Sequence, residues 1–305
     1  MPTMAAGTDQ ASSTPPFNKS PFDATDTAAD VILRSCDGED FYVQSALLTL
    51  ASPVFATMLT LPQKMHTEET TDLSARSSSP PIIDLADDKE SLYQLLLWCG
   101  PRAVRSWKLE DIEGALRLAD KYDMRGIVKH LGETLMRISA YLEEPMKLYA
   151  IGIQYGFEEV ARAAAKETLN HPLETRQFVP QLHNISAAAL HRLHEYYFAC
   201  GLAGMGVAKK LGETTQDLAT WYPPPPPMCV CPSERIASGF LRSKWWGVYI
   251  NLVQEELKIR PRDATVLGLI AHAAGPLQTP LACAYCRALV FPDLIIAVCI
   301  KVGGV

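Results

Sequence analysis

The chain has 305 residues, of which 48% are hydrophobic and 20% are charged, and its formal net charge is -6. This composition is typical of folded globular proteins and excludes a chain that is disordered throughout. Nucleic-acid binding requires clustered Lys and Arg, and the sequence has no long basic run, so we expect no nucleic-acid partner.

The sequence carries no secretion or membrane signal. Residues 1–20 are rich in Thr, Ser, Pro and Ala and lack the basic start and apolar run of a signal peptide. The apolar stretch Leu294–Ile300 is much shorter than the roughly 20 residues that a membrane helix needs. We therefore expect an intracellular protein, in the cytoplasm or nucleus, without membrane association. Residues 1–27 hold few apolar groups and are predicted to form a disordered leader.

The first folded pattern is a β-hairpin. Residues 30–35 and 41–43 are short apolar strand candidates, and Asp37-Gly38 lies between them. Both turn residues tolerate positive φ, which makes this pair a strong hairpin signal. A third strand is predicted at Ile82–Leu85, after a polar loop at 62–79.

Helices are predicted around these strands. A short helix covers residues 46–51, and Ser52-Pro53 supplies a capping side chain and a favourable first residue for the next helix. That helix places four apolar residues on one face, and these are Val54, Phe55, Met58 and Leu59. Apolar residues spaced three and four apart predict three further helices. The first follows Asp87-Asp88 and carries Leu92, Leu95, Leu96 and Cys99. The second carries Leu109, Ile112, Leu116 and Ala119, and the third opens with Ile127, Val128 and Leu131.

The rest of the chain reads as mainly helical. Helical spacing occurs near residues 145–155, 157–170, 174–182 and 186–210, and again at 245–259. The run Pro223–Pro227 favours an extended conformation and is interpreted as a spacer. We therefore expect a domain at 28–130, a helical extension at 131–222, and a Pro-rich linker followed by a Cys-containing helical tail at 223–305.

Several segments, which follow one another in the family's order along the chain, resemble a BTB/POZ domain. They are Ala29–Leu33, Asp40–Val43, Leu47–Leu50, Ala51–Phe55 with Met58-Leu59, Ile82–Leu85 with Asp87-Asp88, and Leu118–Met124. Segments in the right order over about a hundred residues make the resemblance specific. Leu61-Pro62-Gln63 and Cys99-Gly100-Pro101 are similar to the variant common in mushroom-forming (basidiomycete) fungi.

The sequence departs from the family pattern at three positions. Gln44 and Ser45 stand where the family usually has a His-Lys pair, and Gly100 stands where it usually has Tyr. The loop 63–70 lacks the spacing of a hydrophobic residue two positions before a Glu that cullin-binding members use.

The resemblance implies an α+β fold, with a small mixed sheet flanked by helices, followed by an all-α C-terminal region. It implies a non-enzymatic interaction module that forms homodimers or serves as an adaptor or regulatory scaffold for protein partners. A cullin ubiquitin ligase scaffold stays an alternative partner. The candidate interaction residues lie within 28–65 and are Asp30, Phe41, Val43, Phe55, Met58 and Leu59.

Two cysteine pairs are the candidate metal ligands, Cys229/Cys231 and Cys283/Cys286. Four thiolates can bind zinc tetrahedrally. The alternative is that these cysteines are buried and reduced, since the spacing of the pairs departs from that of a zinc ribbon. A zinc-stabilised regulatory or transcription-related protein is therefore a second hypothesis, and no other cofactor is predicted.

Other polar groups are interpreted as structural. His191, His194 and Glu195 do not have the spacing of a zinc-protease helix and indicate a polar helix face. Gly201, Gly204 and Gly206 lack the strand and following Lys of a phosphate-binding loop, which favours helix packing. The acidic pair Asp87/Asp88 is interpreted as solvated. An enzyme that uses residues 130–300 would need a deep pocket with convergent titratable groups.

Overall fold

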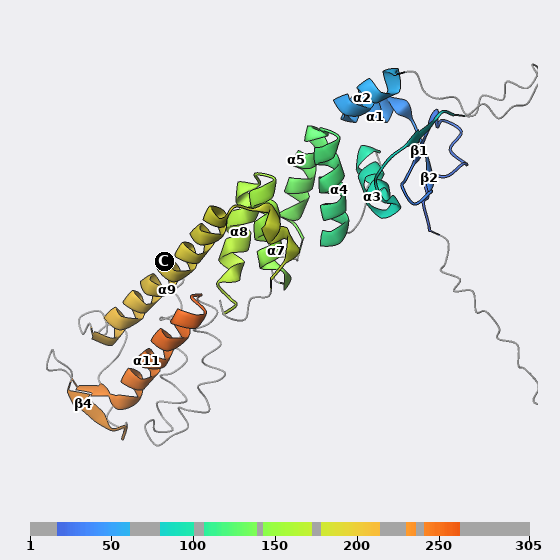
Figure 1. Cartoon of the computed structure of the whole chain (residues 1–305). Helices are drawn as coiled ribbons and strands as arrows, with labels where there is room; N and C mark the ends of the chain where they lie inside the picture. The colour runs from blue at the N-terminus through green and yellow to red at the C-terminus, as the bar shows by residue number, and fades with distance from the viewer. Residues whose placement is uncertain are drawn as a thin grey trace, which may run out of the picture. The chain divides into compact units, whose positions relative to one another are not determined.

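The computed structural model describes residues 17–61, 80–100, 107–138, 143–172, 178–213, 230–235 and 241–262. The chain divides into two compact units, Met1–Ile138 and Ser139–Val305, which are coloured from blue to green and from green to orange in Figure 1.

A three-stranded sheet forms one side of the first unit. Its strands are β1 (Val31–Arg34), β2 (Asp40–Val43) and β3 (Ile82–Asp84) in the order β2-β1-β3. β1 pairs antiparallel with β2 and parallel with β3, so Leu33 lies opposite both Phe41 and Ile83. Gly38 has a φ of 84°, which confirms that the hairpin turn needs a residue with a permissive backbone.

Two short helices follow the hairpin, α1 (Ser45–Ala51) and α2 (Pro53–Thr60). The sharp boundary between them is set by Ser52, whose hydroxyl oxygen accepts a 3.0 Å hydrogen bond from the Phe55 amide. Pro53 occupies the first turn, where the missing N–H costs nothing. The predicted cap is therefore confirmed.

Three longer helices complete the first unit, α3 (Lys89–Cys99), α4 (Leu109–Lys121) and α5 (Arg125–Leu135). Asp88 caps α3 by accepting a 2.7 Å hydrogen bond from the Ser91 amide. The apolar faces predicted for α3 and α4 bury seven residues in the core, which are Leu92, Leu95, Leu96, Leu109, Ile112, Leu116 and Ala119.

Residues 17–27 were predicted to belong to a disordered leader, and the structure places them against the first unit. The Phe17 ring lies edge-on to Phe41 and to Tyr93, with ring centroids 6.3 and 5.6 Å apart. The Tyr93 hydroxyl donates to the Ser20 carbonyl at 3.0 Å, and the Tyr42 amide donates to the Phe22 carbonyl at 3.0 Å. The rings of Phe17 and Phe22 give this short segment its apolar contacts with the first unit.

The second unit begins with a helical hairpin, α7 (Pro145–Gln154) and α8 (Glu158–Thr168). Gly156 in the connecting turn has a φ of 71°. Gly152 lets the helices approach closely, because a Cβ on it would lie only 2.8 Å from the Ala161 nitrogen. The small residues of both helices therefore decide the packing distance.

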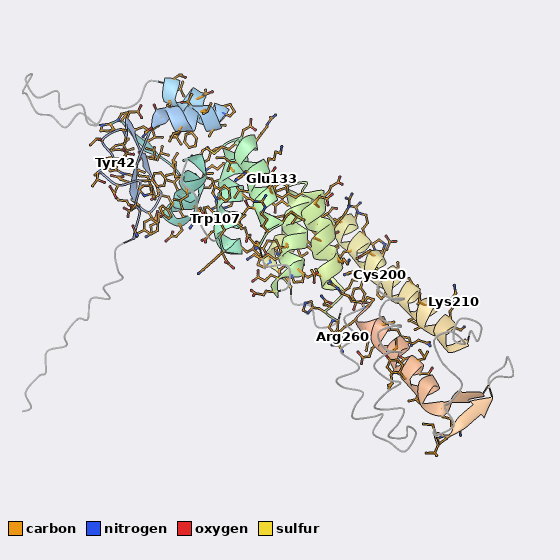
Figure 2. The ribbon with its side chains drawn as sticks, turned by 180° about the vertical axis from the view of Figure 1, so that it is seen from behind. Tyr42, Trp107, Glu133, Cys200, Lys210 and Arg260 are labelled. Carbon is orange, nitrogen blue, oxygen red and sulfur yellow. The ribbon has the colours of Figure 1, made fainter. Side chains whose placement is uncertain are left out.

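A long helix, α9 (Ala187–Glu213), packs against α11 (Lys244–Ile259). Figure 2 shows Arg260, just after α11, near the Cys200 part of α9. A Cβ on Gly201 would lie 3.3 Å from the Leu257 carbonyl, so Gly201 serves helix packing as predicted. Of the helix predicted at 174–182, residues 174–177 lie outside the described residues. The remainder differs from the prediction, since the structure has a short 3-10 helix at Pro180–Asn184 that begins with Pro180.

The first unit confirms the predicted α+β fold with a small mixed sheet. The region after it was predicted to be all-α and is mostly helical. The second unit also contains a two-stranded antiparallel sheet, β4 (Ser233–Arg235) and β5 (Leu241–Ser243), which the sequence analysis did not predict. None of the helices described in the structure is long and apolar enough to cross a membrane.

Candidate interaction surface

Three exposed apolar side chains of the first unit lie on or directly after α1 and α2. Leu50 is 87% exposed, Val54 is 36% exposed, and Leu61, directly after α2, is 59% exposed. Among the described residues of this unit, the only other exposed large apolar side chain is Met136, at the end of α5. We call Leu50, Val54 and Leu61 the α1–α2 surface.

The predicted interaction residues divide between core and surface. Phe41, Val43 and Phe55 are buried, so in this conformation they support the domain from inside. Met58 and Leu59 are partly exposed on α2, and Asp30 is exposed beside the start of α1. The sequence analysis did not single out Leu50, although its place opposite the buried Leu48 on a short helix was a usable signal.

Asp30 fixes the start of α1. Its carboxylate accepts hydrogen bonds from the Ser45 amide and the Ser45 hydroxyl, each at 2.6 Å. The bond from the hydroxyl is the main cause that holds the pKa of Asp30 below its ordinary value. A negative charge beside the first turn also matches the helix dipole. The carboxylate therefore orients the helix that carries Leu50.

A buried polar network fixes α2. The Ser52 hydroxyl donates a 2.6 Å hydrogen bond to the Tyr122 carbonyl, and the Phe55 ring stacks on the Tyr122 ring with centroids 4.5 Å apart. The Tyr122 hydroxyl in turn donates to the Asp87 carboxylate.

Asp87 is only 4% exposed, which corrects the interpretation of Asp87 as a solvated acid. Lys121 and Tyr122 compensate its carboxylate, with the Lys121 ammonium 2.8 Å from both oxygens. Such pairing is what makes a buried charge tolerable. The sequence reading missed this network because its partners are far apart in the chain.

The predicted zinc ligands are largely outside the described residues. This holds for Cys229, Cys283 and Cys286, while Cys231 is partly buried just before β4. Within the described ranges, no three His, Cys, Asp or Glu side chains come together as a metal site. The zinc hypothesis stays a prediction, and metal analysis of the purified chain and its Cys283→Ser variant would test it.

The polar residues predicted to form a helix face lie on α9. His191 and Glu195 are exposed on α9, with a 3.4 Å contact between the imidazole and the carboxylate, which fits a polar helix face. The loop 63–70, on which the cullin prediction depends, lies outside the described residues.

Comparison with known proteins identifies a family for the first unit. Residues 20–139 match the BTB/POZ domain family, in agreement with the strand order, the helices and the ordered segments described above. No curated protein sequence matches the chain significantly.

Proposed function

We propose that this chain, whose residues 20–139 form a BTB/POZ domain, is a protein-interaction module that self-associates through the α1–α2 surface. The BTB/POZ family is an interaction family that generally lacks catalysis, and this supports a role as an adaptor or scaffold. The observation that carries the proposal is the exposure of Leu50, at 87%, on α1.

Exposed apolar side chains on two neighbouring helices leave apolar area in water, which is unfavourable unless a partner covers them. Burying a leucine side chain is worth roughly 1.5–3 kcal/mol. In a twofold dimer the same patch is buried on both subunits, so each contact is made twice. Leu50, Val54 and Leu61 would then supply the apolar centre of the interface.

The rigidity of the α1–α2 surface supports the same proposal. Asp30 fixes the start of α1, and Ser52 and Tyr122 fix the start of α2. A helix pair held in this way loses little conformational freedom on binding, and less free energy is lost to ordering.

Sedimentation equilibrium of the full chain tests the proposal with two matched variants. Leu50→Asp places two charges in the proposed dimer interface and is expected to weaken dimerisation by about tenfold or more. Leu202→Asp changes an equally apolar and 69% exposed residue on α9 and should leave the dimer unchanged. A wild-type chain that is monomeric at every concentration, or a Leu50→Asp chain that dimerises normally, would overturn the proposal.

Cullin binding remains the alternative within the same class. Its test is a pull-down of purified cullin amino-terminal domain by the full chain, with Met65→Ala as the variant in the loop 63–70. Binding that is lost on this change would favour the ligase-adaptor role over simple dimerisation.

A further inference from the structure

A groove in the second unit lies among α7, α8 and α9. Its volume is about 560 Å³, and its apolar lining includes Ile153 from α7, Ala161 and Ala165 from α8, and Leu193 from α9. The groove is held open by the helices themselves. The buried Tyr149 hydroxyl of α7 donates a 2.8 Å hydrogen bond to the Ala189 carbonyl of α9, which fixes the spacing of these two helices.

Cationic side chains line this groove from two helices. Arg162 and Lys166 come from α8 and Arg192 comes from α9. Arg162 is already neutralised, because its guanidinium is 2.9 Å from Glu158 and 3.1 Å from Glu159.

Lys166 and Arg192 differ from Arg162. Their side chains are exposed and make no hydrogen bond or ion pair with any residue that the structure describes. The acids nearest in sequence are engaged elsewhere, since Glu195 contacts His191 at 3.4 Å and Glu167 contacts Arg262 at 2.6 Å. Among the residues that the structure describes, two cations without an acidic partner therefore flank an apolar surface.

We propose that this groove binds an acidic segment of a partner protein, with apolar side chains against Ile153 and the 39% exposed Tyr196 and carboxylates paired with Lys166 and Arg192. Apolar contact would supply affinity and the paired charges would supply orientation and specificity. The site is separate from the α1–α2 surface, so the proposal goes beyond self-association and does not depend on it.

The lining favours a peptide over a nucleic acid. The groove is mainly apolar, which suits leucine-like side chains and offers few donors to a sugar-phosphate backbone.

The test is fluorescence anisotropy with the full chain and a labelled synthetic peptide of alternating Glu-Glu and Leu-Leu pairs. Two comparison peptides replace every Glu by Lys or every Leu by Ser. We expect the acidic, apolar peptide to bind at least about tenfold more tightly than either comparison peptide, and more weakly as salt rises.

Paired variants locate the binding. Lys166→Glu with Arg192→Glu should weaken binding of the acidic, apolar peptide by about tenfold or more. Lys209→Glu with Lys210→Glu makes the same charge change near the other end of α9, where Figure 2 labels Lys210, and should change affinity less than about twofold. Lys166→Gln with Arg192→Gln provides a milder pair, and circular dichroism checks that each variant is folded.

Three results would overturn the proposal. They are no binding by the full chain, equal binding of the acidic and Lys peptides, and equal loss in the two charge-reversed pairs. Sedimentation without peptide measures self-association independently of peptide binding. The proposed dimer and the proposed peptide site can therefore fail separately.

Discussion

Tyr122 donates a 2.5 Å hydrogen bond to the carboxylate of Asp87, which joins the end of α4 to the segment after β3. Burial and this bond raise the pKa of Tyr122, so the ring remains a neutral donor at physiological pH. The same tyrosine accepts a hydrogen bond from Ser52 through its carbonyl and stacks on Phe55. One residue thus connects the buried acid to the helix pair that carries the α1–α2 surface.

Tyr122→Phe removes the hydroxyl and leaves the Asp87 carboxylate with one fewer partner. The free energy of unfolding should fall by about 1–3 kcal/mol, because the acceptor is buried. Urea unfolding monitored by circular dichroism measures this loss. Tyr93→Phe is the control, since its hydroxyl donates to the Ser20 carbonyl at an exposed position, and it should cost less. Equal stability of Tyr122→Phe and the wild type would contradict the structural role of the bond.

Ser52→Ala removes two hydrogen bonds together. The side chain accepts from the Phe55 amide and donates to the Tyr122 carbonyl, and it is fully buried. We expect a loss of about 1–3 kcal/mol from the missing cap and the unsatisfied buried carbonyl. Thr57→Ala, at an exposed position of α2, should change stability by less than about 0.5 kcal/mol. Thermal unfolding measures both variants. Similar melting temperatures of the Ser52→Ala and Thr57→Ala chains would argue against the role of Ser52 as a cap.

Substitution by alanine is expected to change the free energy of unfolding in opposite directions at Gly152 and Gly206. In Gly152→Ala the new methyl group would lie 2.8 Å from the Ala161 nitrogen, so α7 and α8 must separate, and we expect a loss of about 1–3 kcal/mol. In Gly206→Ala the methyl group meets nothing within 4 Å, and α9 should gain roughly 0.5–1 kcal/mol from better helix propensity. Urea unfolding tests both, and a Gly152→Ala chain as stable as the wild type would disprove close packing of the hairpin.

Burial raises the pKa of the Cys99 thiol to about 12. The neutral thiol is thus favoured in the folded state, while an unfolded cysteine ionises near pH 9. The stability that comes from burying Cys99 as a neutral thiol is fully present below about pH 9 and is lost as the pH rises towards 12. The pH dependence of unfolding above pH 9 should be shallower in Cys99→Ala than in the wild type.

Thiol labelling gives an independent measurement on the same residue. Cys36 is exposed, so iodoacetamide at pH 8 should modify it well before Cys99 in the folded chain. Peptide mass spectrometry after timed quenching reads each site separately. Equal labelling rates for Cys36 and Cys99 would mean that Cys99 is not protected, whereas equal rates only in urea would fit the structure.

The sequence by itself determined the features that depend on neighbours in the chain. The Asp37-Gly38 turn, the Ser52 cap and the buried stripe of α4 follow from backbone freedom, capping chemistry and helical periodicity. The order of these elements was enough to identify the BTB/POZ fold, because each rule needs only a few consecutive residues.

Only the tertiary structure decided which side chains are buried and which gather into surfaces. Asp87 is buried because Lys121 and Tyr122 reach it from a helix more than thirty residues later. Phe41 and Leu50 are both apolar, yet one lies in the core and the other faces outward. The groove among α7, α8 and α9 likewise depends on how these three helices pack. These outcomes depend on contacts between distant segments, and residue type alone does not specify them.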